Sequence, residues 1–156
     1  MPVRVLFVCL GNICRSPMAE AVFQHHVDAA GLGDAIQVDS AGTSDWHTGE
    51  SAHRGTLHVL RQHGIDYAGR ARTVSPRDFE RFDYILAMDD SNLANLRRLM
   101  PEGSRAKVHM FLDYAPDASS REVPDPYYDG RFEEVYQLVE QGARGLLEHI
   151  RREKGL

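Results

Sequence analysis

Short apolar runs alternate with longer amphipathic stretches along this chain. Residues 3–8 form a nearly continuous run of β-branched and aromatic side chains, which is typical of a strand buried on both of its faces. Three further apolar runs predict strands over residues 36–40, 84–88 and 107–112. The sequence therefore predicts a sheet of four strands.

Four other stretches have apolar residues at helical spacing. They predict helices over residues 17–30, 52–63, 91–99 and 131–152. Pro17 suits the first position of a helix, so Ser16 is the expected N-cap. The last helix carries one apolar stripe, formed by Phe132, Val135, Val139, Ala143, Leu146 and Ile150.

This alternation of strands and helices predicts parallel strands joined by right-handed crossovers. The expected fold class is α/β, a three-layer sandwich with a four-stranded parallel sheet, helices on both faces and a phosphate-binding loop between the first strand and the first helix. Ligands of such sheets bind beyond the carboxyl ends of the strands. That rule selects a rim formed by residues 9–15, 40–46, 89–90 and the segment after Leu112.

The composition is that of an ordinary globular protein. With 156 residues, 42% of them hydrophobic and 26% charged, we expect a single domain over residues 1–156. No apolar run approaches the roughly 20 residues of a membrane helix, so no membrane insertion is expected. The first apolar run lacks the cleavage site of a signal peptide, and Cys9 and Cys14 are too few for a disulfide framework. The expected compartment is a reducing cytoplasm.

The net charge of −5 argues against nucleic acid as the main partner, because nucleic-acid-binding domains usually carry a basic face. The 8 histidines show no spacing that would bring metal ligands together. His53, His58 and His63, for example, lie on different faces of one predicted helix. We expect neither a metal nor another cofactor.

The segment between the first strand and the first helix has the composition of an anion-binding loop. Gly11 and Asn12 tolerate positive φ, so successive backbone N–H groups can turn inward. The following helix presents free N–H groups, and Arg15 adds a planar fork that matches two phosphoryl oxygens. Because these surroundings favour the thiolate form of a cysteine, Cys9 is the predicted nucleophile. The alternative is a buried thiol at the end of a strand with an arginine on the surface.

Residues 8–20, VCLGNICRSPMAE, resemble the signature of the low-molecular-weight protein tyrosine phosphatases. The resemblance continues in order over nearly the whole chain, at residues 40–43, 45–46, 82–89 and 125–128. It implies a metal-independent phosphatase that works through a phosphocysteine intermediate. Its expected partners are phosphotyrosine-containing proteins as substrates and inorganic phosphate as product.

The resemblance also implies a role for individual residues. Cys9 resembles the nucleophile, Arg15 the residue that holds the phosphoryl oxygens, and Asp125 the general acid that later acts as base. The rest of the expected site comprises the loop residues Leu10, Gly11, Asn12, Ile13, Cys14 and Ser16, the cleft walls Trp46, Tyr127 and Tyr128, and the supporting residues Ser40 and Asp89. In relatives, the second cysteine of the loop can form a disulfide with the nucleophile after oxidation.

Tyrosine is a poor leaving group, since its phenol has a pKa of about 10, and its expulsion requires a proton donor. Asp125 precedes Pro126 in the segment after the last predicted strand, which places it on the expected rim. Asp113, Asp117 and Asp129 are rival carboxylates in the same segment. A plain Asp-Pro turn is the structural alternative.

One position departs from the family pattern. Many relatives carry a histidine where this chain has Gly69, and that histidine helps to anchor the serine of the loop. The departure predicts that Ser16 is held less tightly and that activity persists with an altered pH dependence.

Three other functions share parts of this pattern. Arsenate reductases on this scaffold use further cysteines to regenerate the nucleophile, whereas this chain has only two cysteines. Protein arginine phosphatases carry threonine at the position of Ile13, which favours tyrosine as the substrate here. A non-catalytic phosphate-binding module would need only the loop and Arg15, so the nucleophile and the acid argue against it.

Overall fold

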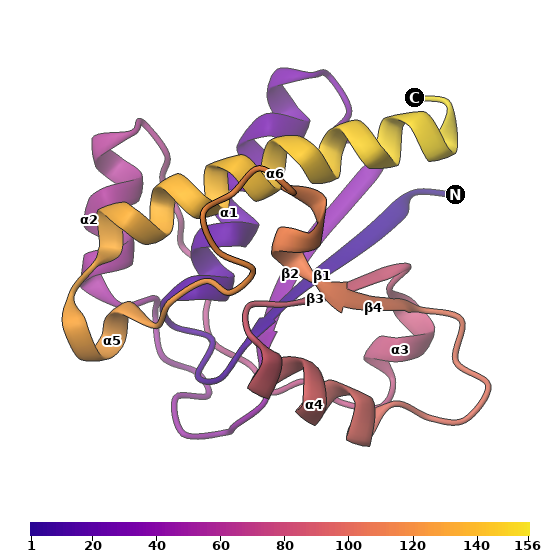
Figure 1. Ribbon diagram of the computed structural model, residues 1–156, viewed down its shortest axis with the longest axis horizontal. Helices are drawn as coiled ribbons and strands as arrows, with labels where there is room; N and C mark the ends of the chain where they lie inside the picture. The colour runs from indigo at the N-terminus through magenta and orange to yellow at the C-terminus, as the bar shows by residue number, and fades with distance from the viewer.

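The computed structural model describes residues 1–156. Its four strands are β1 (Val3–Cys9), β2 (Ile36–Gly42), β3 (Tyr84–Ala87) and β4 (Lys107–Met110). They form one sheet in the order β2-β1-β3-β4, and every neighbouring pair is parallel (Figure 1). The predicted four-stranded parallel sheet is confirmed, with β1 between β2 and β3.

Helices cover both faces of the sheet. On one face lie α1 (Arg15–Ala29), α2 (Arg54–Gln62) and the long α6 (Phe132–Lys154). The other face carries α3 (Asp78–Arg81) and α4 (Asp90–Leu99) (Figure 1). This arrangement confirms the three-layer α/β sandwich. No helix combines the length and the apolar character that a membrane span requires.

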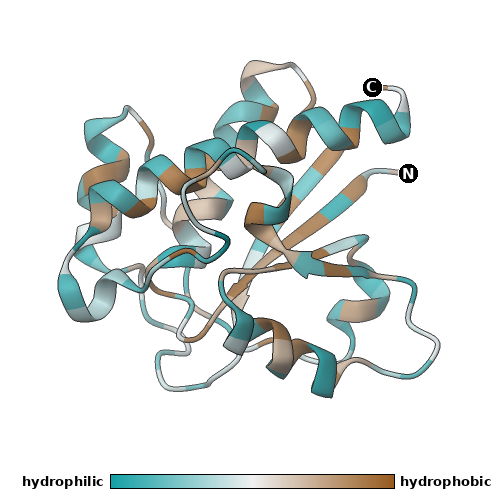
Figure 2. Cartoon of the chain, in the orientation of Figure 1, coloured by the Kyte–Doolittle hydropathy of each residue, from teal (hydrophilic) through white to brown (hydrophobic).

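The side chains of β1 alternate between two apolar cores. Val5 and Phe7 pack on the side of α1 and α6, where the Phe7 ring meets Phe23 edge-on at 5.6 Å between ring centroids. Leu6 and Val8 belong to the core on the side of α3 and α4. Burial on both faces therefore explains why β1 is apolar at nearly every position, as its hydrophobic colouring shows (Figure 2).

Three short elements differ from the sequence prediction. β4 ends at Met110 and continues as a 3-10 turn, η1 (Phe111–Tyr114), where the sequence predicts a strand to residue 112. α3 and α5 (Pro126–Asp129) have only 4 residues each and were not predicted, because one turn is too short to show a helical period.

The start of α1 also differs from the prediction. The helix begins at Arg15, and Cys14 occupies the N-cap position without a capping side-chain hydrogen bond. The prediction of Ser16 as N-cap is wrong. Its hydroxyl is engaged with Asn12 and Cys9, so it is not free to cap the helix.

The carboxyl ends of β1, β2 and β3 meet at one rim of the sheet. Cys9 is in register with Gly42 on β2, and Val8 is in register with Ala87 on β3. The order of the strands reverses at β1, which is where α/β sheets bind ligands. A Cβ atom at Gly42 would lie 2.8 Å from the carbonyl oxygen of Leu10, so glycine allows the loop after β1 to approach β2 closely.

Candidate active site

The loop from Leu10 to Cys14 turns its carbonyl groups outward. The carbonyl of Leu10 accepts from the backbone N–H and the hydroxyl of Ser44, that of Ile13 from the N–H of His53, and that of Cys14 from the hydroxyl of Thr56. The N–H groups of Leu10 to Cys14, in contrast, donate to no other group of the protein. A run of free N–H groups in one loop favours an anion, as the composition of the segment predicts.

Asn12 fixes the shape of this loop. It is the one non-glycine residue with positive φ, at 57°, a conformation that asparagine tolerates better than most residues. Its side-chain oxygen accepts from the backbone N–H of Arg72 at 3.0 Å. This bond orients the amide, so that Nδ2 donates to Ser16 Oγ at 2.8 Å and to Ser40 Oγ at 3.0 Å.

Cys9 ends β1 at the base of the loop. Its Sγ atom lies 3.0 Å from the hydroxyl of Ser16, and both side chains are buried. The second cysteine of the loop, Cys14, is also buried and free. Burial, together with the neighbouring Cys9 and Asp125, raises the pKa of the Cys14 thiol to about 12. Cys14 therefore remains a neutral thiol at physiological pH.

Arg15 is buried at the start of α1, and its guanidinium is held on two sides. Nη1 donates to Asp89 Oδ2 at 2.7 Å and to the carbonyl of Val123 at 3.0 Å. Burial alone would lower the pKa of Arg15, but the Cys9 sulfur and the hydrogen bond to Asp89 outweigh it and raise the pKa. Arg15 is therefore a fixed positive charge beside the loop.

Asp125, which is far from Arg15 in the sequence, also lies next to its guanidinium. Its Oδ2 lies 3.6 Å from Arg15 Nη2, and its Oδ1 accepts from the backbone N–H of Tyr127 at 3.1 Å as the N-cap of α5. The segment before it is attached to the sheet, because the N–H of Val123 donates to the carbonyl of Met88 at 2.8 Å. The rim thus holds Asp125 next to the loop.

These residues line a cleft of about 220 Å³. Its floor is formed by the loop and Arg15, and its walls by Trp46, His47, Asp125, Tyr127 and Tyr128. Asp125 is the one carboxylate in the lining. Asp113 pairs with Arg121 at 3.6 Å outside the cleft, and Asp129 pairs with Arg131 at 2.8 Å. The geometry therefore favours Asp125 over the rival carboxylates.

Nearly the whole chain matches one protein family. The family model described as low molecular weight phosphotyrosine protein phosphatase matches residues 4–156. The chain belongs to this family. It is 48% identical to the low molecular weight protein-tyrosine-phosphatase YfkJ of Bacillus subtilis over 99% of both sequences. It is 53% identical to the low molecular weight phosphotyrosine protein phosphatase of Schizosaccharomyces pombe, over 88% of this chain and 91% of that relative.

Solved structures of the phosphatase family have the same fold. The crystal structure of YfkJ from Bacillus subtilis matches with a TM-score of 0.95, over 99% of this chain and 98% of that one. The structure of DARP, a Drosophila arginine phosphatase, is 35% identical and matches with a TM-score of 0.89 over 94% of this chain and 97% of that one.

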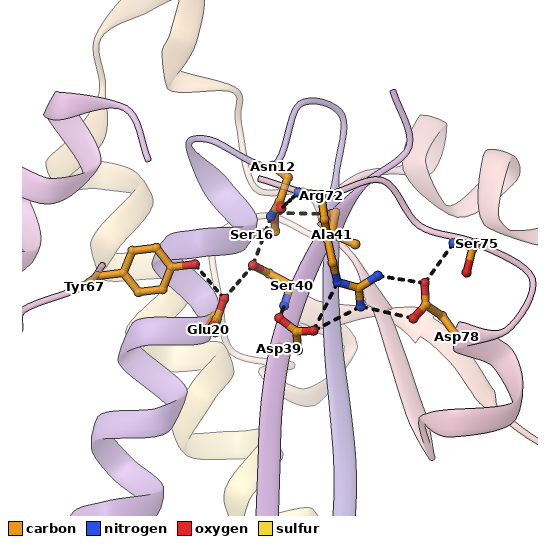
Figure 3. Close-up of polar contacts among 10 residues, drawn as sticks. All are labelled: Asn12, Ser16, Glu20, Asp39, Ser40, Ala41, Tyr67, Arg72, Ser75 and Asp78. Atoms are coloured by element: carbon orange, nitrogen blue, oxygen red, sulfur yellow. Dashed lines mark hydrogen bonds and ion pairs between the residues drawn. The ribbon is translucent and has the colours of Figure 1, made fainter. Parts of the chain in front are cut away.

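The sequence analysis does not identify four residues that line the cleft or support its loop. His47 lines the cleft, with its ring centroid 6.1 Å from that of Tyr127. Glu20, Tyr67 and Arg72 support the loop from behind through Ser40 and Asn12 (Figure 3). His47 could have been found from its place next to Trp46. The contact between Glu20 and Tyr67 joins residues 47 positions apart and has no local signal in the sequence.

Proposed function

We propose that this protein hydrolyses phosphotyrosine in proteins, and small aryl phosphates, through a phosphocysteine intermediate. The observation that carries the proposal is that Cys9, Arg15 and Asp125 line one cleft with a loop of free N–H groups at its floor. Nucleophile, anion site and proton donor are the three components that the reaction needs.

In the first step, the phosphoryl oxygens bind the N–H groups of the loop and the guanidinium of Arg15. The Cys9 thiolate attacks phosphorus, and the bond to the phenolic oxygen breaks. Asp125, in its protonated form, gives its proton to that oxygen, so the leaving group departs as neutral tyrosine. The fixed positive charge of Arg15 stabilises the negative charge of the transition state.

In the second step, Asp125 is a carboxylate and accepts a proton from the attacking water. The oxygen of this water bonds to phosphorus, the bond from phosphorus to Cys9 Sγ breaks, and the sulfur leaves as a thiolate. Inorganic phosphate is the product. The same loop and Arg15 serve both steps, because the phosphoryl group stays in one place while the nucleophile and the leaving group change.

The walls of the cleft favour an aromatic phosphoester. Trp46, Tyr127 and Tyr128 surround its mouth and are exposed there, so they are available to contact a phenyl ring. Ile13 is also part of the lining, and its apolar side chain suits an aromatic ring better than the charged guanidinium of phosphoarginine. Two cysteines do not provide the additional thiols of an arsenate reductase. Free thiols such as Cys9 and Cys14 are most easily kept reduced in the cytoplasm, which we propose as the compartment of this protein.

The test is phosphate release from a phosphotyrosine peptide in reducing buffer with a metal chelator. We expect turnover by the wild type and none by Cys9→Ser. Phosphate binding to both proteins would be measured by isothermal titration calorimetry. Binding without release by the wild type would indicate a binding module. Turnover of phosphoarginine or of arsenate instead of phosphotyrosine would indicate the corresponding alternative.

A further inference from the structure

The space beside Gly69 is filled by the side chain of Tyr67. A Cβ atom at residue 69 would lie 2.5 Å from Cζ of Tyr67 and still closer to its hydroxyl oxygen, so a side chain at position 69 and this tyrosine exclude each other. The hydroxyl donates to Glu20 Oε1 at 2.8 Å (Figure 3). The space beside residue 69, where the family resemblance implies a histidine in many relatives, is therefore occupied by a different donor from two residues upstream.

From Glu20, hydrogen bonds lead to the nucleophile. The same Oε1 atom accepts from Ser40 Oγ at 2.6 Å, and Ser40 lies on β2 behind the loop. Ser40 Oγ is 3.0 Å from Asn12 Nδ2, which also lies 2.8 Å from Ser16 Oγ. Figure 3 shows this path from Glu20 to Ser16. Since Ser16 Oγ lies 3.0 Å from Cys9 Sγ, the path continues to the nucleophile.

The donor and acceptor roles along this path are fixed by the Glu20 carboxylate and by the backbone N–H of Arg72. A carboxylate only accepts, so the one proton of Ser40 points to Glu20 and its oxygen accepts from Asn12. The amide of Asn12 cannot turn over, because its oxygen already accepts from the backbone N–H of Arg72.

These fixed roles determine where the Ser16 proton points. Ser16 Oγ accepts from Asn12 Nδ2, which leaves its own proton to donate. The available acceptors are Cys9 Sγ at 3.0 Å and the more distant carbonyl of Ala41 at 3.5 Å. Donation to the sulfur stabilises a thiolate more than a thiol.

We propose that Glu20 and Tyr67 are positioning residues that direct the Ser16 hydroxyl proton toward the Cys9 sulfur. In this chain, which has Gly69 instead of the histidine of many relatives, Tyr67 fills the space beside the glycine and donates to Glu20. The proposal rests on the proposed function only in that Cys9 is the nucleophile. It replaces the expectation from Gly69 that Ser16 is held less tightly, because Ser16 is held by Asn12 and Asn12 by the groups behind it.

The charge of Glu20 depends on its donors. Burial raises the pKa of the Glu20 carboxyl above its ordinary value, and the hydrogen bonds from Ser40 and Tyr67 offset this only in part. Burial and the adjacent Glu20 carboxylate in turn raise the pKa of the Tyr67 hydroxyl, so Tyr67 remains a donor throughout the physiological range. Tyr67 therefore helps to keep Glu20 an acceptor.

Two substitutions at Glu20 separate hydrogen bonding from charge. Both Glu20→Gln and Glu20→Met remove the negative charge, but glutamine keeps an oxygen that can accept from Ser40 and Tyr67, whereas methionine does not. Loss of a nearby negative charge alone makes Cys9 easier to ionise, equally in both variants. Loss of the acceptor has the opposite effect and is confined to methionine.

The experiment measures the pH midpoint of Cys9 alkylation by iodoacetamide, which needs no phosphoester turnover. We expect the midpoint of Glu20→Met to lie about one pH unit above that of Glu20→Gln, the effect of one lost hydrogen bond, because the lost charge acts equally on both variants. Tyr67→Phe should raise the midpoint above that of the wild type, by a smaller amount. Tyr84→Phe is the matched control, because it removes another partly buried tyrosine–glutamate hydrogen bond, to Glu153, away from the cleft.

Equal shifts in the two Glu20 variants, or a midpoint unchanged in both Glu20→Met and Tyr67→Phe, would overturn the proposal. If Glu20→Met does not fold, as judged by circular dichroism, the comparison of Tyr67→Phe with Tyr84→Phe decides. A wild type that alkylates at Cys9 with the expected differences but releases no phosphate would leave this inference standing and refute the proposed function. Failure of the proposed function is thus distinguishable from failure of the role assigned to Glu20 and Tyr67.

Discussion

Asp89 and Arg15 form an ion pair that is largely shielded from solvent, with 2.7 Å between Oδ2 and Nη1, at the point where β3 ends and α1 begins. The other oxygen of Asp89 accepts from the backbone N–H of Asn92 at 2.8 Å and caps α4. One carboxylate therefore stabilises a helix and holds the guanidinium that we assign to phosphate binding.

Substitution of Asp89 should separate these two roles. Asn is as good an N-cap as Asp, so Asp89→Asn should keep the stability of α4 while losing the charge that holds Arg15. We expect kcat/KM for a phosphotyrosine peptide to fall about tenfold in this variant, the loss of one charge-assisted hydrogen bond. Asp89→Ala should show the same loss of activity and, in addition, a midpoint of thermal unfolding lower by about 2–4 °C. Equal melting temperatures in the two variants would refute the capping role.

The acid role of Asp125 predicts a dependence on the leaving group. Asp125→Asn should lower kcat for phosphotyrosine by about 100-fold or more, because the phenolate then leaves without a proton. A strongly acidic phenol leaves readily as a phenolate, so kcat for an aryl phosphate with such a leaving group should fall much less in Asp125→Asn. Asp113→Asn is the matched control, since Asp113 pairs with Arg121 outside the cleft, and it should retain wild-type rates. A loss that is equal for both leaving groups would exclude the role of general acid.

The fold could be predicted because its signals are local. The apolar residues of β1 follow from burial on both faces, and the alternation of strands and helices leaves few topologies. The anion-binding loop is also predicted by a local signal, since Gly11, Asn12 and Arg15 lie within five consecutive positions and each suits an anion site. The ends of the elements are predicted less well than the elements themselves. The strand predicted to residue 112, for example, ends at Met110 and continues as a 3-10 turn.

The support of the loop could not be predicted, because it depends on contacts between distant residues. The rule for N-caps predicts that the Ser16 hydroxyl caps α1. In the structure this hydroxyl instead forms hydrogen bonds with Asn12 and Cys9. The effect of Gly69 was predicted from the missing histidine alone. Nothing in the sequence indicates that Tyr67 turns back over the glycine to reach Glu20.

The exposed ring of Trp46 predicts a role in binding rather than in chemistry. Trp46→Ala should raise KM for a phosphotyrosine peptide about five- to tenfold, the contribution of one aromatic contact, and change kcat little. The inhibition constant of inorganic phosphate should stay at the wild-type value, because phosphate occupies the loop and not the walls. An equal weakening of phosphate and of peptide would mean that Trp46 supports the loop.

The two cysteines are equally buried, so we expect their reactivity to differ because of their surroundings and not because of exposure. Because the pKa of the Cys14 thiol is about 12, this residue should stay unmodified by iodoacetamide at pH 7–8. Peptide mass spectrometry of the wild type should find the label at Cys9, and Cys9→Ser should take up almost none. Comparable labelling of Cys14 at this pH would contradict the effect of its burial.

A last prediction concerns Glu153 near the end of α6, which ties this helix to the sheet. Hydrogen bonds from Lys107, at 2.6 Å, and from Tyr84 lower the pKa of the Glu153 carboxyl to about 2 from an ordinary value of 4.5. A carboxyl whose pKa is lower in the folded state stabilises the fold fully above its unfolded value, and this contribution disappears as the pH falls toward 2. Glu153→Gln should therefore melt about 2–4 °C below the wild type at pH 7, a modest effect because the pair is partly exposed, and the difference should shrink steadily below pH 4.5. Thermal melts of both proteins at pH 7, 5 and 3.5 would measure it, and a difference that stays constant or grows toward acid would show that the ionised form of Glu153 is not what stabilises this end of the helix.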